Sequence, residues 1–329
     1  MQQITKHFFT LLRITLALGM LYYLAWSGSI DWSSFAGLAK GWHYTVLAIV
    51  LFFIATVIQA WRLQILINSQ HLNLPFLASI RLTFIGLFFN TYLPGATGGD
   101  LVKIYYASKG NPGCRTEVIT ILLLDRFIGL FSLLTLPLML APLFPQLVAS
   151  QAVLQVLLAT SLAIALGIGI TAIIGARTDL ANSRIMHWIE NRVALGSRIS
   201  RMLHTLHSYR NHKAALYKAL ASSYFLQLLM VIVSLCIAQA TNPAGADLKM
   251  IVLIPLGYLA NSLPVTPGGL GVGEAALESL FSLGGLQGGA EVILGWRLIM
   301  VIVGLLGLVF YLRGEKRFVF NTREQEAET

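Results

Sequence analysis

Residues 90–100 read Asn-Thr-Tyr-Leu-Pro-Gly-Ala-Thr-Gly-Gly-Asp, and residues 261–270 read Asn-Ser-Leu-Pro-Val-Thr-Pro-Gly-Gly-Leu. Each stretch interrupts a longer apolar segment, near 76–108 and near 250–283. Asn, Leu-Pro and Gly-Gly recur in the same order, with one residue fewer in the second copy. Broken backbone inside hydrocarbon is tolerated only against protein or a watery cavity, because an unpaired backbone group there costs several kcal/mol. The two stretches therefore predict a pair of re-entrant helical hairpins.

The composition around these stretches is that of an all-α polytopic membrane protein. Of 329 residues, 56% are hydrophobic and 11% are charged, whereas soluble domains carry about 25% charged residues. That balance excludes a soluble enzyme, and apolar dominance without a short repeat excludes disorder, collagen and coiled coil. Apolar runs of about 20 residues predict six full spans: 8–27, 43–61, 118–140, 152–175, 216–240 and 291–312. We expect the first span to remain as a helix rather than to be cleaved as a signal peptide, because the internal symmetry requires it.

The net charge of +9 indicates topology, because Lys and Arg accumulate in cytoplasmic loops. With both termini in the cytoplasm, the loop 176–215 and Lys103 lie inside, and only Lys40 and Lys249 fall outside. The same orientation places Arg62 at a cytoplasmic helix end, where its side chain can snorkel. No nucleic-acid-binding module accompanies the basic residues, so we expect no nucleic-acid partner. The expected location is the bacterial inner membrane.

This orientation gives the two hairpins opposite senses. Segment 76–108 enters and leaves on the cytoplasmic side, and segment 250–283 enters and leaves on the outer side. Each half of the chain, 1–145 and 146–312, then contains two full spans, one hairpin and a third span. A cytoplasmic tail follows at 313–329. Such an inverted-topology repeat is the architecture of many secondary transporters.

The glycine pairs predict helix starts near the middle of the membrane. Each pair precedes a short helix whose free N–H groups and positive dipole end favour an anion, and glycine lets a ligand approach the backbone closely. The alternative is that Gly and Pro only shape a tight hairpin. The residues expected to contact substrate here are Asn90, Gly98, Gly99, Asn261, Gly268 and Gly269, and those expected to shape the hairpins are Pro94, Pro264, Pro267, Gly271 and Gly273.

Two arginines lie inside predicted spans and match across the repeat. At an offset of 171 residues, Arg126 falls on Arg297. A charge at the centre of a span costs roughly 2.5–3.5 kcal/mol and needs a partner or a cavity. The planar guanidinium binds two phosphate oxygens at once. We expect both arginines to contact the phosphate of a substrate; the alternative is a fixed ion pair between helices.

Four carboxylates complete the predicted site. Asp100 and Glu274 lie in or near the first turn of the short helices, where a carboxylate acts as a cap. The alternative is that they pair with an arginine or exchange a proton during transport. Glu278 lies one turn beyond Glu274 and shares its face. Asp125 adjoins Arg126, but neighbours on a helix point about 100° apart and need not pair with each other.

The remaining candidates for metal or redox chemistry are weak. His204 and His207 have metal-ligand spacing, but no third ligand accompanies them, so we expect interfacial histidines and no metal or cofactor. Cys114 and Cys236 fit no zinc or redox spacing. In the loop 176–215, apolar residues recur at near-helical spacing among arginines, which predicts an amphipathic helix or helix pair on an anionic leaflet.

The two motifs resemble those of the lysylphosphatidylglycerol synthase/flippase transmembrane family, also called the UPF0104 family. The acid–arginine pair Asp125-Arg126 in a middle span also resembles a pair found in the family. The residues that carry the resemblance in the hairpins are Asn90, Pro94, Gly98, Gly99 and Asp100 in one half, and Pro264, Pro267, Gly268, Gly269, Gly271, Gly273 and Glu274 in the other.

The resemblance implies a function in lipid translocation. The best-known members join this membrane domain to a soluble domain that transfers lysine from charged tRNA to phosphatidylglycerol, and the tail at 313–329 has no room for that domain. The resemblance implies that this protein moves a lipid between leaflets. The lipid would be a phospholipid or a polyprenyl-phosphate-linked lipid, and a lipid-modifying enzyme would be a partner. The alternatives are an integral membrane enzyme or accessory subunit in lipid-linked sugar metabolism, and a small-solute transporter. No Walker motif is present, so we do not expect ATP hydrolysis by that route.

Overall fold

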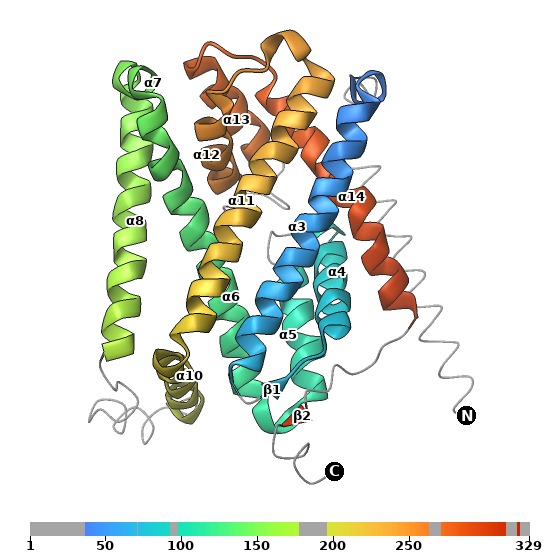
Figure 1. Ribbon diagram of the computed structural model, residues 1–329, viewed down its shortest axis with the longest axis vertical. Coiled ribbons are helices and arrows are strands. Elements are labelled where there is room, and N and C mark those ends of the chain that lie inside the picture. Colours follow the sequence, from blue (N-terminus) through green and yellow to red (C-terminus); the bar gives the residue numbers. More distant parts are fainter. Residues whose placement is uncertain are drawn as a thin grey trace. The chain divides into compact units, whose positions relative to one another are not determined.

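The computed structural model describes residues 37–70, 72–92, 98–177, 196–262, 271–313 and 321–322. In these residues the chain is helical apart from short connections and one antiparallel pair of two-residue strands (Figure 1). The pair joins β1 (Leu72–Asn73) to β2 (Asn321–Thr322), with Leu72 opposite Thr322. The predicted all-α class is confirmed.

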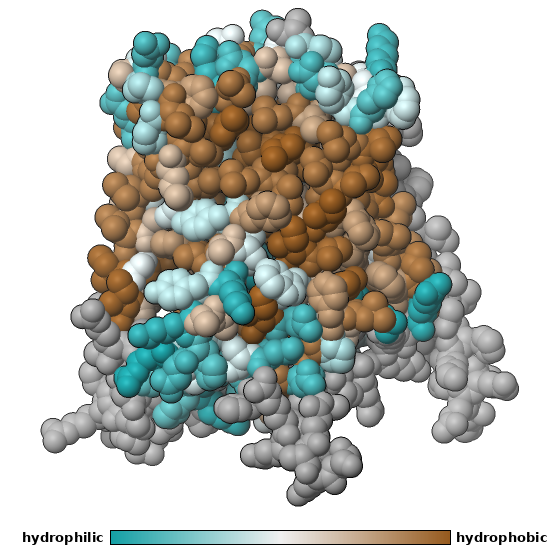
Figure 2. Space-filling model, in the orientation of Figure 1, coloured by the Kyte–Doolittle hydropathy of each residue, from teal (hydrophilic) through white to brown (hydrophobic). Residues whose placement is uncertain are grey.

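Among the described residues, five helices are long and apolar enough to cross a membrane. They are α3 (Trp42–Asn68), α6 (Arg115–Leu140), α8 (Ala152–Arg177), α11 (Lys213–Thr241) and α14 (Gly289–Leu312). They match five of the six predicted spans, and the sixth, 8–27, lies outside the described residues. On the face that Figure 2 shows, hydrophobic side chains cover the middle stretches of the long helices, and hydrophilic side chains gather near helix ends. The chain is therefore a multi-pass membrane protein.

Proline sets the connection between the two central spans. The uncharged stretch after α6 passes through a 3₁₀ turn, Ala141–Leu143, into α7 (Pro145–Ser150) and then α8. Pro142 lies at the start of the 3₁₀ turn, and Pro145 is the first residue of α7. At such positions the N–H that proline lacks would have no intrahelical acceptor. Further 3₁₀ turns occur at Pro112–Cys114, Tyr209–Asn211 and Pro243–Gly245.

Each broken apolar segment forms two helices. The first contains α4 (Phe76–Tyr92) and α5 (Gly98–Gly110), and the second contains α12 (Met250–Ser262) and α13 (Val272–Leu283). Helix α13 packs against both α12 and α14. The connecting residues 93–97 and 263–270 lie outside the described residues, and with them Pro94, Pro264, Pro267, Gly268 and Gly269. Re-entry into the membrane and the inverted repeat stay predictions.

A short helix occupies the described part of the basic loop. Helix α10 (Gly196–Ser208) packs against α6 and α8, with Ser200 and Thr205 buried and Arg201 and His204 exposed. The buried side chains named here are polar, and the apolar Leu206 of the same helix is 41% exposed. The remainder of the loop, 178–195, lies outside the described residues, and contact of α10 with an anionic leaflet stays a prediction.

The described chain forms two compact units that interleave along the sequence. The first unit contains 37–56, 83–92, 98–102, 228–262 and 271–313, and the second contains 57–70, 72–82, 103–177, 196–227 and 321–322. The units are clusters of contacts and do not coincide with the two sequence halves. Each polar cluster below lies within a single unit.

Candidate functional site

The first polar cluster surrounds Arg297 in the middle of α14. This arginine is 8% exposed on a helix that is otherwise almost entirely apolar. Its Nε atom donates to Glu274 Oε1 at 2.8 Å, and one terminal nitrogen donates to Glu274 Oε2 at 3.4 Å. The same nitrogen donates to Asn261 Oδ1 at 2.9 Å. Three predicted site residues from α12, α13 and α14 are therefore joined by charge-assisted hydrogen bonds.

Glycine makes this close approach of α12 and α13 feasible. A Cβ atom on Gly273 would overlap the Asn261 carboxamide oxygen. Gly271, which precedes α13, has φ +79°, a conformation that residues with a Cβ rarely adopt. Both residues were predicted to shape the hairpin, and here they bring Glu274 to the start of α13 beside the arginine.

Glu278 has a different contact from that of Glu274, although both belong to α13. Its Oε2 atom accepts the backbone N–H of Ala290 at 3.0 Å. Ala290 lies in the first turn of α14, where backbone N–H groups have no intrahelical acceptor. Glu278 therefore acts as a cap supplied by the neighbouring helix, while Glu274 forms the ion pair.

The first hairpin repeats the contact between asparagine and glycine. Asn90 Oδ1 accepts the backbone N–H of Gly99 at 2.7 Å. A Cβ atom on Gly99 would overlap the carbonyl oxygen of Gly86. The asparagine near the end of α4 thus binds the first turn of α5, in which Gly98 and Asp100 also lie. The two predicted asparagines serve matching roles, since each contacts the start of its hairpin's second helix.

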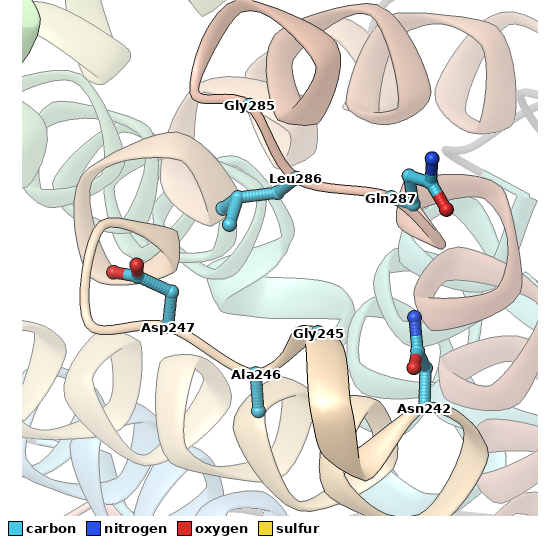
Figure 3. Close-up of a pocket in the computed structure, with 7 residues that line it drawn as sticks. All are labelled: Asn242, Gly245, Ala246, Asp247, Gly285, Leu286 and Gln287. Carbon is cyan, nitrogen blue, oxygen red and sulfur yellow. The ribbon is translucent and has the colours of Figure 1, made fainter.

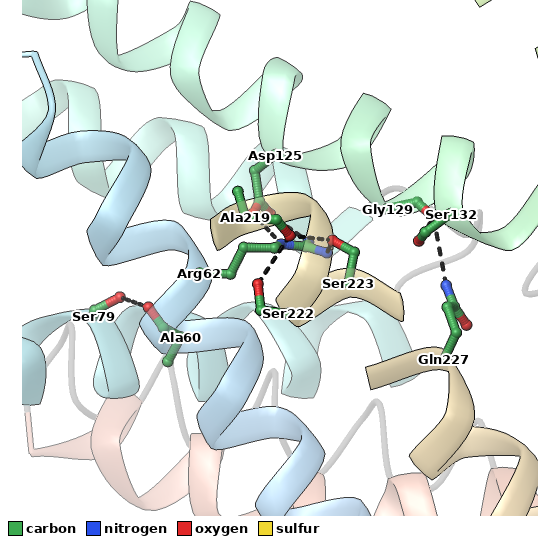
Figure 4. Close-up of polar contacts among 10 residues, drawn as sticks. All are labelled: Ala60, Arg62, Ser79, Asp125, Gly129, Ser132, Ala219, Ser222, Ser223 and Gln227. Carbon is green, nitrogen blue, oxygen red and sulfur yellow. Dashed lines mark hydrogen bonds and ion pairs between the residues drawn. The ribbon is translucent and has the colours of Figure 1, made fainter. Parts of the chain in front are cut away.

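The second polar cluster joins α3, α6 and α11 (Figure 4). Arg62 Nε donates to Asp125 Oδ1 at 2.7 Å, and Arg62 NH2 donates to Asp125 Oδ2 at 3.0 Å. Its third nitrogen donates to the Ser223 hydroxyl at 2.7 Å, and Ser223 donates in turn to the carbonyl of Ala219. Arg62 is 4% exposed, so the expectation that it snorkels at a helix end is wrong. Asp125 pairs with Arg62, while Arg126 lies on the exposed side of α6.

A buried lysine lies near this pair. Lys103 on α5 is 5% exposed and lies within electrostatic reach of Asp125 and Arg62. The cytoplasmic side predicted for Lys103 stays a prediction, and the structure adds that its side chain is covered within α5. The charges of Asp125 and Arg62 thus both act on Lys103.

The comparisons with known proteins agree with the motifs in the hairpins. A family model described as the lysylphosphatidylglycerol synthase transmembrane region matches residues 10–307. The chain belongs to this family. A UPF0104 membrane protein from Pyrococcus horikoshii is 22% identical over 338 residues, covering 96% of this chain and 99% of its own length. No solved structure matches.

This member of the lysylphosphatidylglycerol synthase transmembrane family also has a polar pocket of about 360 Å³ in the first unit. It lies between the loops that join α11 to α12 and α13 to α14, and the carboxamides of Asn242 and Gln287 lie on the same side of it (Figure 3). The third polar side chain, Asp247, accepts the backbone N–H of Lys249 at 2.8 Å and faces its ammonium at 3.7 Å. The pocket thus offers neutral carboxamides rather than a cation suited to phosphate.

Apart from Asp125, sequence reasoning missed the residues of the second cluster. Arg62, Lys103 and Ser223 belong to three helices far apart in this family member's chain, so no local motif joins them. The available signal was hydropathy, because Arg62 interrupts an apolar run that continues past it. In the described residues, no group of three or more His, Cys, Asp or Glu residues could hold a metal.

Proposed function

We propose that this protein moves a phosphate-bearing lipid between the leaflets of a membrane. The observation that carries the proposal is the buried Arg297, which presents a guanidinium inside an apolar spanning helix. A buried ion pair contributes little net stability, because desolvation of both charges offsets their attraction. An arginine kept there at such cost is a functional candidate. Membership of a family named for a lipid synthase supports a lipid as the substrate.

The contacts of Arg297 are those that a phosphate would need. A phosphate presents two oxygens to the planar guanidinium in the same way as a carboxylate. One of the two Glu274 contacts is long, at 3.4 Å against 2.8 Å. Glu274 therefore holds the arginine in place and is exchanged for the lipid phosphate when substrate arrives.

The start of α13 adds a second attraction for the phosphate. Backbone N–H groups in the first turn of a helix have no intrahelical acceptor, and the dipole there is positive. Gly273 lies in this turn, and the Asn261 carboxamide, which also accepts from Arg297, lies against it. We propose that the phosphate binds between this turn and Arg297, with Gly268, Gly269 and Asn261 as further contacts, and that Asn90, Gly98, Gly99 and Arg126 serve the first half.

The substrate proposed here is a phospholipid or a polyprenyl-phosphate-linked lipid. Transport takes place in the bacterial inner membrane, with both termini in the cytoplasm and with a lipid-modifying enzyme as a potential neighbour. The driving force is a gradient, or none where lipid only exchanges between leaflets, and we propose no lysyl transfer.

Lipid scrambling in liposomes tests this function. Purified protein is reconstituted with fluorescent phosphatidylglycerol, and dithionite bleaching measures exchange between leaflets. We expect Arg297→Ala to slow exchange about tenfold or more, since a hydrogen bond to a charged group contributes roughly 1.5–3 kcal/mol. Arg313→Ala, at the exposed end of α14, is the matched control and keeps the wild-type rate. Arg126→Ala is measured alongside and is expected to slow exchange.

Two results would contradict the proposal. If Arg297→Ala folds and exchanges lipid at the wild-type rate, Arg297 does not bind the phosphate. If the wild-type protein accelerates no phospholipid and no polyprenyl-phosphate lipid, the protein is not a lipid translocase.

A further inference from the structure

The polar pocket of the first unit lies at the ends of four helices. Its volume of about 360 Å³ is within the range of about 300–1,000 Å³ that is usual for small-molecule sites. Its residues lie in the connection between α11 and α12 and in the connection between α13 and α14. The pocket is therefore at the end of the second hairpin where α12 begins and α13 ends, beside the ends of two spanning helices. In the predicted topology this is the outer side of the membrane.

Two carboxamides and one carboxylate face this pocket. Asn242 and Gln287 lie on one side of it, and Asp247 lies across from them (Figure 3). The Asn242 side chain does not cap the 3₁₀ turn that follows it, and Gln287 is exposed. Each carboxamide offers N–H donors and a carbonyl acceptor. The pocket thus presents donors and acceptors from two sides, which suits a ligand with several hydroxyl groups.

The charge beside the pocket is balanced within the protein. Among the described residues that line the pocket, only Asp247 is charged. One of its oxygens accepts the backbone N–H of Lys249 at 2.8 Å, and the other faces the Lys249 ammonium at 3.7 Å. The ammonium also donates to the carbonyl of Gly284 at 3.3 Å. Asp247 therefore disfavours a phosphate in the pocket, and Lys249 weakens the attraction of a cation. A neutral ligand meets neither penalty.

Gly245 allows the Asn242 carboxamide to lie against the 3₁₀ turn. A Cβ atom on Gly245 would lie 2.6 Å from Asn242 Nδ2, which is closer than van der Waals contact allows. A side chain at position 245 would therefore displace the carboxamide. The position of one of the two carboxamides thus depends on a glycine in the same connection.

We infer that this pocket binds the neutral, hydroxyl-rich part of a lipid headgroup, a sugar or a glycerol. The inference rests on the proposed function, since it takes the hydroxyl groups to be carried by a lipid. Gly289 at the start of α14 and Arg297 are separated by about 12 Å along the helix axis. The pocket is therefore a site separate from Arg297. It selects the headgroup at the end of the hairpin, and Arg297 contacts the phosphate farther along α14.

Lipid binding to the purified full-length protein tests this inference. The detergent is octaethylene glycol monododecyl ether, which contains no sugar, and the rise in unfolding temperature is measured against ligand concentration. Glucosyl dioctanoylglycerol supplies hydroxyl groups without a phosphate, and dioctanoyl phosphatidic acid supplies a phosphate without a polyol. Free glucose is the soluble source of the same hydroxyl groups.

The variants remove the two carboxamides at nearly constant size. We expect Asn242→Leu and Gln287→Met together to weaken binding of the glucosyl lipid about tenfold, the loss expected of one or two neutral hydrogen bonds. Binding of phosphatidic acid stays as in the wild type. Gln151→Met is the matched control, because it removes a carboxamide from the connection between α7 and α8, and it binds every probe as the wild type does.

The outcomes separate this inference from the proposed function. Equal binding of the glucosyl lipid by the wild type and the folded variants overturns the pocket, and so does a wild type that does not bind this lipid. Free glucose that binds as tightly as the glucosyl lipid overturns the assignment to a headgroup. Where Asn242→Leu does not fold, Gln287→Met alone gives the comparison, since its side chain is exposed. A wild type that binds the glucosyl lipid but exchanges no lipid in liposomes contradicts the proposed function alone.

Discussion

In each hairpin, one asparagine contacts one glycine across the two helices. Asn90 accepts the N–H of Gly99, and Asn261 lies against Gly273 while it accepts from Arg297. In both cases the carboxamide near the end of one helix contacts the first turn of the next. The sequence motif showed that these residues recur, but the sequence did not show that they touch.

Alanine at Gly99 tests this contact. Gly99→Ala places a methyl group onto the backbone carbonyl of Gly86, which cannot rotate away as a side chain can. Overpacking of this kind typically costs about 1–3 kcal/mol, and we expect the free energy of unfolding to fall by at least that much in mixed micelles, measured by circular dichroism.

The matched control is Gly167→Ala, in the apolar helix α8. A Cβ atom at Gly167 has no atom within 4 Å, and alanine is better than glycine inside a helix by roughly 0.5–1 kcal/mol. This variant is expected to be slightly more stable than wild type. Equal effects of the two substitutions would show that the contact between Gly99 and Gly86 has no energetic consequence.

Three helices meet at one ion pair in the second unit. Arg62 from α3 binds Asp125 from α6 and Ser223 from α11, and a Cβ atom on Gly129 would lie 3.4 Å from the guanidinium. Such a pair specifies which faces of the helices meet, because a shift of any helix leaves a buried charge without its partner.

Removal of one partner of this pair is expected to destabilise the protein strongly. Asp125→Asn leaves the Arg62 charge uncompensated, and breaking a buried pair typically costs about 3–5 kcal/mol. Arg126→Ala changes the next residue, which is exposed on α6, and we expect it to alter stability by less than about 0.5 kcal/mol. Urea or detergent unfolding of both variants gives the comparison. Similar losses in the two variants would contradict the assignment of the pair.

The errors made from sequence at this scale have one physical origin. Hydropathy ended the second predicted span at residue 61, whereas α3 continues to Asn68. That end lies about 9 Å beyond Arg62 along the helix, too far for the side chain to reach an interface with ease. The partner on α6 is 63 positions away in sequence, so the pattern around Arg62 contains no trace of it. The spans themselves were predicted well, because length and apolar character are local properties.

At the scale of the whole molecule, the distribution of Lys and Arg predicts on which side of the membrane each loop lies, and the observed helices are compatible with that topology. Five of the six spans are present in the described residues, and the sides of the membrane follow from the cations in the loops. Lys109 is predicted to lie inside, and Lys40 and Lys249 outside. The direction in which each hairpin opens depends on this assignment.

Thiol labelling in whole cells tests the topology. Single cysteines at Lys249 and Lys109 are introduced into a protein in which Cys114 and Cys236 are replaced by Ser. We expect a membrane-impermeant maleimide to label Lys249→Cys in intact cells, and Lys109→Cys only after permeabilisation. The reverse pattern would place the hairpins on the opposite sides from those predicted.

The native thiols supply a background control for this labelling. Burial and the neighbouring Glu117 carboxylate raise the pKa of the Cys114 thiol, and the thiolate is the form that reacts with maleimide. Cys236 is 8% exposed. The protein with both native cysteines and no added one is therefore expected to label slowly at neutral pH.

The contacts of α13 also decide how the second hairpin can move. Glu274 and Glu278 lie one turn apart on α13 and bind α14 at two levels, the Arg297 side chain and the Ala290 N–H. Beside the Ala290 contact, at the start of α14, Gly289 lies so close to Leu277 that a Cβ atom would overlap the backbone. Shear, in which one helix slides along the other, would break both carboxylate contacts together. Hinge rotation about the connection 284–288 can keep the Glu278 contact while Glu274 leaves Arg297, so bending is the motion that this helix pair permits.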